Sequence, residues 1–92
     1  MRIIGEFDSG DIKVSVFKMN ERISIKFEKQ LMEQTYKFRD GSAVNTLEDA
    51  KIFCSEQTID EINKVFLAMA NTRSNSLNSM MAAEEDEFDE II

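Results

Sequence analysis

Apolar and polar residues alternate along much of the first 40 positions of the chain. Residues 12–16, 23–27 and 35–39 place an apolar side chain at every second position, which is the period of a strand with one buried face. A shorter apolar segment at 2–7 precedes a turn in which Gly10 can adopt a positive φ angle. Because the connecting segments are short, the pattern predicts a four-stranded antiparallel β-meander.

The predicted strands cover about residues 2–7, 12–19, 22–28 and 33–39. One sheet face is expected to be apolar and buried, and it holds Ile12, Val14, Val16, Ile23, Ile25, Phe27, Tyr36 and Phe38. The opposite, outer face is expected to be polar and mildly basic, with Lys13, Ser15, Arg22, Ser24, Lys26, Glu28, Glu33, Thr35, Lys37 and Arg39. Phe17 interrupts the alternation and indicates either a bulge or an aromatic side chain on the outer face.

The apolar pattern changes to a helical period after position 46. Thr46 stands three residues before Asp49, close to a capping box, and predicts a short helix over about 47–54. A stripe with spacings of three and four residues then predicts a longer helix over about 57–72, formed by Ile59, Ile62, Phe66, Met69 and Ala70. This helix is expected to cover the inner face of the sheet, since that face must be buried. The predicted fold class is therefore α+β, with residues 1–73 as a single domain.

The C-terminal residues combine a Ser/Asn-rich segment with an acidic amphipathic segment. Residues 71–79 are mostly Asn, Ser and Thr, which favour caps and turns, so a linker is expected at 74–79. At about 100° per residue, the later apolar side chains fall within an arc of about 120°, and they are Leu77, Met80, Met81, Phe88, Ile91 and Ile92. Asp86, Asp89 and Glu90 fall on the opposite side, and only Glu84 enters the apolar arc. Residues 80–92 are thus expected to form an acidic tail that becomes helical on docking.

A single helix over 56–92 is the alternative to this break. Leu77 follows Ile59 by 18 residues, or about five turns, so one apolar stripe would run through both segments. No Gly or Pro occurs after Gly41. We nevertheless favour a break within 71–76, because the Asn and Ser residues each cost a helix a few tenths of a kcal/mol.

Charge is distributed unevenly along the 92 residues. The chain has 18 acidic and 11 basic residues, for a net charge of −7. Residues 1–83 hold 11 basic and 12 acidic residues, so the remaining −6 lies in 84–92. The length fits one domain. The net charge argues against a nucleic-acid or anionic-membrane binder, but this argument weakens for the nearly neutral folded core.

The residue types that carry catalysis are sparse. The chain has no His, which is the commonest general base and zinc ligand, and its glycines form no phosphate-binding loop. Cys54, the only cysteine, falls on the inward face of the short predicted helix and is interpreted as a structural thiol. We therefore expect a non-enzymatic protein with no cofactor, metal or small-molecule substrate. No signal peptide or membrane span is recognisable, so a cytoplasmic protein is expected.

The patterns leave two functional hypotheses. The first is a protein-interaction, adaptor or assembly module whose C-terminal segment docks on another protein or on a second copy of itself. Docking of the segment on its own sheet is the third alternative, and it would be structural rather than functional. Its binding residues would be Leu77, Met80, Met81, Asp86, Phe88, Asp89, Glu90, Ile91 and Ile92. The alternative is a single-stranded nucleic-acid binder that uses the outer sheet face, through Lys13, Phe17, Arg22, Lys26, Lys37 and Arg39. Residues 86–92, Asp-Glu-Phe-Asp-Glu-Ile-Ile, resemble the acidic tails of single-stranded-DNA-binding proteins, which implies a tail that recruits partners or competes with DNA.

Overall fold

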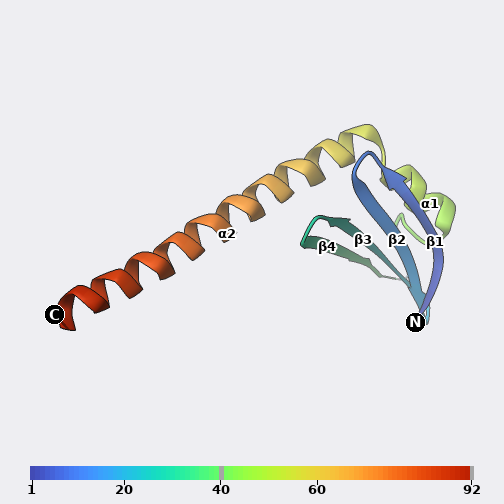
Figure 1. The fold of residues 1–92 in the computed structure, drawn as a ribbon. Coiled ribbons are helices and arrows are strands. Elements are labelled where there is room, and N and C mark those ends of the chain that lie inside the picture. Colours follow the sequence, from blue (N-terminus) through green and yellow to red (C-terminus); the bar gives the residue numbers. More distant parts are fainter. Residues whose placement is uncertain (40, 92) are drawn as a thin grey trace.

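The computed structural model describes residues 1–39 and 41–91, with side chains in these segments up to Ala82. It consists of four strands followed by a short and a long helix (Figure 1). The elements are β1 (Arg2–Ser9), β2 (Ile12–Met19), β3 (Arg22–Lys29), β4 (Met32–Phe38), α1 (Leu47–Phe53) and α2 (Glu56–Ile91). This order confirms the predicted α+β fold with an antiparallel sheet.

The strands form one sheet in the order β1-β2-β3-β4, and each strand is antiparallel to its neighbour. A two-residue turn joins each pair, and its first residue has a positive φ angle: 62° at Gly10, 57° at Asn20 and 55° at Gln30. The third turn consists of Gln30 and Leu31, within the connection of residues 29–32 left between the predicted strands. A bulge in β1 between Ile3 and Gly5 shifts its register against β2.

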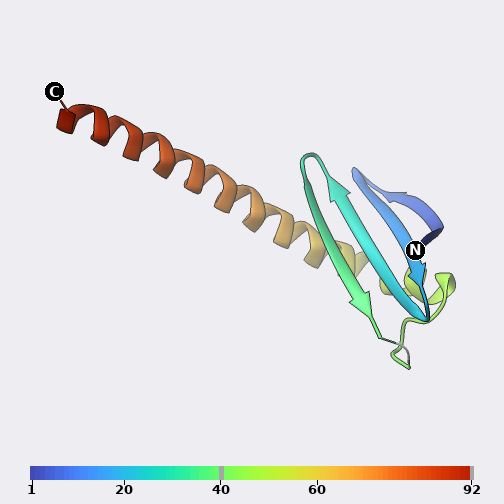
Figure 2. The ribbon, with the colours of Figure 1, turned by 90° about the horizontal axis from the view of Figure 1, so that it is seen from below.

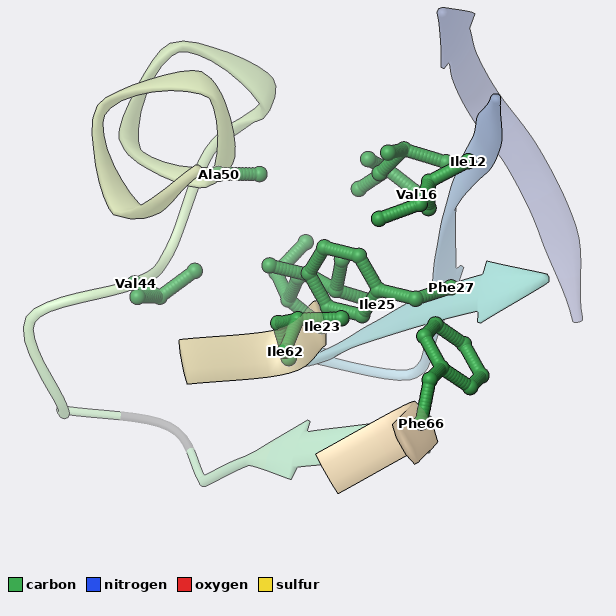
Figure 3. Packing of buried hydrophobic residues seen from close by; sticks show 10 residues of the cluster. Ile12, Val16, Ile23, Ile25, Phe27, Val44, Ala50, Ile62 and Phe66 are labelled. Atoms are coloured by element: carbon green, nitrogen blue, oxygen red, sulfur yellow. The ribbon is translucent and has the colours of Figure 1, made fainter. Parts of the chain in front are cut away.

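The hydrophobic core lies between the inner sheet face and the two helices. All six inner-face residues predicted on β2 and β3 are almost fully buried. Val44, Ala50, Ile62 and Phe66 cover them from the loop, α1 and α2 (Figure 3). Tyr36 and Phe38 are only half-buried, and both rings pack against Phe53 at centroid distances of 6.4 and 5.1 Å.

Helix α1 begins at the predicted capping box. The Oγ1 atom of Thr46 accepts a hydrogen bond from the backbone N–H of Asp49 at 3.1 Å. In return, the Asp49 carboxylate accepts from the N–H groups of Asn45 and Thr46 at 3.1 and 3.2 Å. These bonds, led by the one from Asn45, lower the pKa of Asp49. The start of this helix packs closely on β1. A Cβ atom added to Gly5 would lie only 2.5 Å from the Leu47 side chain.

Helix α2 continues without interruption through 71–76, so the favoured break is wrong and the single-helix alternative is correct over the described residues. The low helix propensity of Asn and Ser is a small cost, and no Gly or Pro adds a larger one. At 36 residues the helix is about 54 Å long. It makes the molecule 61 × 27 × 19 Å, with a radius of gyration of 18.5 Å against about 12 Å for a compact domain of this length. Figures 1 and 2 show its C-terminal part extending away from the sheet.

Candidate protein-interaction surface

The first part of α2 is fixed to the sheet by both apolar and polar contacts. Ile62 and Phe66 are 3% and 1% exposed. Gln34 on β4 donates from Nε2 to the backbone carbonyl of Ile62 at 3.0 Å, and its Oε1 accepts from the Tyr36 hydroxyl at 2.6 Å. Lys29 Nζ also donates to Asn63 Oδ1 at 3.2 Å. These bonds satisfy polar groups that burial would otherwise penalise, and they fix the position of α2 along β4.

Beyond this anchor the helix loses contact with the sheet. Every residue from 71 to 82 is exposed. Leu77, Met80 and Met81 are 49%, 63% and 62% exposed. Leu77 follows Phe66 by 11 residues, or about three turns, so it lies on nearly the same side of the helix. The stripe that packs on the sheet therefore continues into solvent, and we call residues 71–91 of α2 the overhang.

A groove marks the place where the overhang leaves the sheet. It has a volume of about 350 Å³ and lies between α2 and the β3–β4 turn. Its lining consists of Gln30, Leu31, Met32, Ala70, Arg73, Ser74 and Leu77. Leu31, at the tip of the turn, is 82% exposed, and it extends the apolar surface from the helix onto the hairpin. Leu31 is not among the predicted site residues, although an apolar residue in a tight turn is itself a signal.

The structure describes only part of the predicted binding segment. Leu77, Met80 and Met81 lie on the exposed overhang. The backbone of α2 reaches Ile91. The remaining predicted partner-binding side chains, those of Asp86, Phe88, Asp89, Glu90, Ile91 and Ile92, lie outside the described residues.

The outer sheet face carries the residues of the alternative hypothesis. Strand pairing places Lys13, Phe17, Arg22, Lys26 and Lys37 there, and Arg39 follows β4 directly. Both helices cover the inner face instead (Figure 2). Phe17 is half-buried, and Lys26 Nζ lies 5.3 Å from the centre of its ring.

This outer face is less basic than the sequence predicts. Strand β1 adds Glu6 opposite Ser15 and Asp8 opposite Lys13. Lys26 Nζ is also 3.3 Å from the Glu28 carboxylate, which offsets part of its charge. Ser15 belongs to this face by register but is only 2% exposed, because it lies in the middle of three paired strands.

Cys54 is half-buried against the core at the end of α1. Burial raises its pKa to about 11, so the thiol is protonated at neutral pH. A nucleophilic cysteine needs the opposite shift, towards the thiolate. Among the side chains that the structure describes, no group of three Cys, Asp or Glu residues is placed to hold a metal ion.

None of the described helical residues forms a segment long and apolar enough to cross a membrane. Comparison of the chain with protein-family models, curated proteins and solved structures gives no significant match. Two surfaces of the described residues are therefore the candidate sites, the overhang with its groove and the outer sheet face.

Proposed function

We propose that this protein is a non-catalytic interaction or assembly module that docks through the overhang. The observation that supports the proposal is the continuation of the sheet-packing stripe of α2 beyond the sheet, with Leu77, Met80 and Met81 exposed in succession. Burying a Leu or Met side chain fully is worth about 1.5–3 kcal/mol, so a partner groove gains from covering them. Methionine also adapts to irregular apolar surfaces because its side chain is flexible and polarisable.

Helix energetics also support docking. An isolated helix of about 15 residues is only marginally stable in water, and tertiary packing supplies most of the stability of helices in proteins. The segment 71–79 is rich in Asn, Ser and Thr, and the acidic residues of 84–90 lie at the helix end where the dipole disfavours negative charge. A partner surface would therefore stabilise the overhang as it binds.

The acidic residues supply the electrostatic part of the proposal. Positions Asp86, Asp89 and Glu90 fall opposite the apolar stripe by their spacing, so apolar anchors and negative charges occupy different sides of the segment. Rim charges of this kind affect the rate of association and the choice of partner more than the final affinity. We therefore assign Phe88, Ile91 and Ile92 an anchoring role and the acids a steering role toward a basic rim.

The proposal is tested by affinity capture from the native cell with the tagged full chain. The overhang variant carries Leu77→Asp and Met81→Asp, and the matched control carries Ile52→Asp, since Ile52 is 70% exposed on α1, away from the overhang. We expect the wild-type chain and the Ile52 variant to retain the same partner, and the overhang variant to lose it. Equal recovery by all three chains would contradict docking through the overhang.

A second candidate function is single-stranded nucleic-acid binding on the outer sheet face. It is favoured by Phe17, an aromatic on an uncovered strand surface with Lys26 beside it. Such faces bind single strands by stacking bases on aromatics and by contacting phosphates with basic side chains. The acids Glu6, Asp8, Glu28 and Glu33 on the same face weigh against it, so it ranks second.

Titration with labelled single-stranded DNA and RNA at low and moderate salt tests this second candidate. We expect binding, if it uses this face, to weaken strongly with salt and to be lost with Phe17→Ala combined with Lys26→Ala. Lys64→Ala serves as the control, because Lys64 is an exposed basic residue on α2, away from the outer face. No binding by the wild-type chain at low salt rules the candidate out.

A further inference from the structure

We infer that two copies of this chain pair edge to edge through β4, antiparallel about a two-fold axis at Thr35, so that their sheets form one continuous sheet. In this register Glu33 of one copy lies opposite Lys37 of the other, twice in each dimer. It is the antiparallel register in which all seven residues of β4 are paired with β4 of the second copy. This contact lies on a surface separate from the overhang and goes beyond the proposed function.

Strand β4 has a free edge, because the described sheet ends with it and its one neighbouring strand there is β3. The two-residue turn before β4 makes Lys29 and Met32 a hydrogen-bonded pair, and such pairs alternate from there along the strand. The backbone N–H and C=O groups of Glu33, Thr35 and Lys37 therefore point away from β3. A row of such groups is a template for pairing with another strand.

The helices do not occupy the place of a further strand beside β4. Helix α2 packs on the inner face of the sheet, where the Ile62 carbonyl accepts from Gln34, and not in the plane of the sheet (Figure 2). It then leaves the sheet beside the β3–β4 turn, near Met32. Because β4 of the second copy runs in the opposite direction, its own α2 leaves at the other end of the joined strands. The axis at Thr35 thus separates the two overhangs.

The charges at this edge lack partners of opposite sign within one copy. Among the side chains that the structure describes, neither Glu33 nor Lys37 takes part in an ion pair. Glu33 lies directly opposite Glu28 of β3, and like charges in this position destabilise a sheet. In the dimer Lys37 of the second copy lies opposite Glu33 on its free side, and cross-strand pairs of opposite charge are stabilising. The register that pairs the whole strand therefore also pairs its opposite charges.

The inner side of this edge gains apolar contacts, and the contact as a whole is small. Met32 lies opposite Phe38 of the second copy and Gln34 opposite Tyr36, and both rings are only half-buried in one copy. Seven residues span about 24 Å, and a sheet with its side chains is about 10 Å deep. Each copy then contributes roughly 240 Å², whereas stable interfaces bury about 800 Å² per partner. We therefore expect a dimer that forms at high micromolar concentrations and dissociates on dilution.

Amide hydrogen exchange of the full chain, measured by NMR at low and high protein concentration, tests which edge pairs. The N–H groups of Glu33, Thr35 and Lys37 bond to the second copy only in the dimer, so their exchange should slow as the dimer fraction rises. The N–H groups of Gln34 and Tyr36 bond to β3 in both states and serve as internal controls. Exchange at the first three positions that does not depend on concentration would contradict pairing through β4.

Charge reversal followed by sedimentation equilibrium tests the register. Glu33→Lys and Lys37→Glu each place two like-charge pairs across the axis, and we expect each to raise the dimer Kd at least about tenfold. The double variant E33K/K37E should recover the wild-type Kd, and an equal mixture of the two single variants should form mixed dimers. Lys64→Glu is the matched control, since it reverses an exposed charge on α2, and circular dichroism checks that every variant is folded.

A backbone variant complements the charge variants. Thr35→Pro removes an N–H group that points away from β3, which an edge strand tolerates, so it should abolish the dimer while the chain stays folded. The dimer is overturned by a wild-type chain that stays monomeric up to millimolar concentration, by single charge variants that behave like Lys64→Glu, or by a double variant without recovery. If Leu77→Asp with Met81→Asp abolishes self-association and Lys37→Glu does not, the copies meet through the overhang, and pairing through β4 fails while the proposed function stands.

Discussion

The two halves of α2 carry apolar residues on nearly the same side of one helix, but their surroundings are opposite. Phe66 is 1% exposed and packs in the core, whereas Leu77, about three turns later, is 49% exposed. The first half is fixed by the sheet, by Gln34 and by Lys29. The overhang has the same helical backbone without these contacts. The same pattern therefore stabilises the fold in one half and is left exposed in the other, where we propose that it serves for docking.

The largest difference should appear when each half loses one apolar side chain. Phe66→Ala leaves a cavity in the core and should lower the free energy of unfolding by about 3–5 kcal/mol. Leu77→Ala should change the same quantity by less than about 0.5 kcal/mol when measured by urea denaturation at a concentration where the chain is monomeric. An equal loss in both variants would show that the overhang is part of the folded core.

A smaller effect should follow from removing the polar anchor between the halves. Gln34→Ala removes the hydrogen bonds to the Ile62 carbonyl and the Tyr36 hydroxyl and should cost about 1–3 kcal/mol. Hydrogen exchange should then show faster opening of residues 59–70, while the overhang, which already lacks protection from the sheet, changes little. A change confined to the overhang would contradict the anchoring role of Gln34.

The turn beside the groove offers a stabilising change. Gln30 has a φ angle of 55°, a left-handed conformation that costs a residue with a Cβ atom roughly 1 kcal/mol or more. Gln30→Gly should therefore stabilise the sheet by up to about 1 kcal/mol, measured as a higher midpoint of thermal unfolding. Hydrogen exchange of the overhang should stay the same, since the turn strain belongs to the sheet. A lower midpoint would show that the Gln30 side chain contributes more than its backbone costs.

The smallest effect concerns acid and the start of α1. The pKa of Asp49 is lowered from its ordinary value of 3.8, mainly by the N–H of Asn45, so the folded state binds this proton more weakly than the unfolded state. Its contribution is present above pH 3.8 and is lost as the pH falls through the lowered value. Asp49→Ala should therefore be less stable than wild type at neutral pH, and the difference should disappear in acid. A difference that persists in acid would point to a role other than the capping box.

Local periodicity was sufficient to predict the antiparallel sheet and the short and long helices that follow it, although not where the long helix ends. Alternation at 12–16 and 23–27 identified the buried face, because strand side chains point to opposite faces in turn. The same rule places Gln34 on the inner face with Tyr36 and Phe38. A polar side chain is not expected there from the sequence, and the reason for it is the hydrogen bond that Gln34 donates to the Ile62 carbonyl. The continuity of α2 was not predicted, because the free-energy cost of placing Asn and Ser in a helix was overestimated. The apolar residues before and after 71–76 fall on the same side of one helix, which favoured continuity.

Other features depend on tertiary structure and have no local signal. The groove exists because the β3–β4 turn meets α2 near Ala70 and Arg73, residues about 40 positions later in the chain. The acids Glu6 and Asp8 reach the outer face through the register of β1, which the bulge after Ile3 sets. The charge of that face was therefore overestimated from β2, β3 and β4 alone.

The continuity of α2 has a mechanical consequence. A partner bound to the overhang would be joined to the sheet by one continuous helix without a hinge. Its direction relative to the outer sheet face would then be fixed by the rotation of the helix per residue. Adding one residue between Phe66 and Leu77 would turn the docking side by about 100° while moving it only about 1.5 Å along the axis. Distance and rotation are thus coupled in a continuous helix, and the proposed docking side can move along the axis without turning only by insertions close to whole turns.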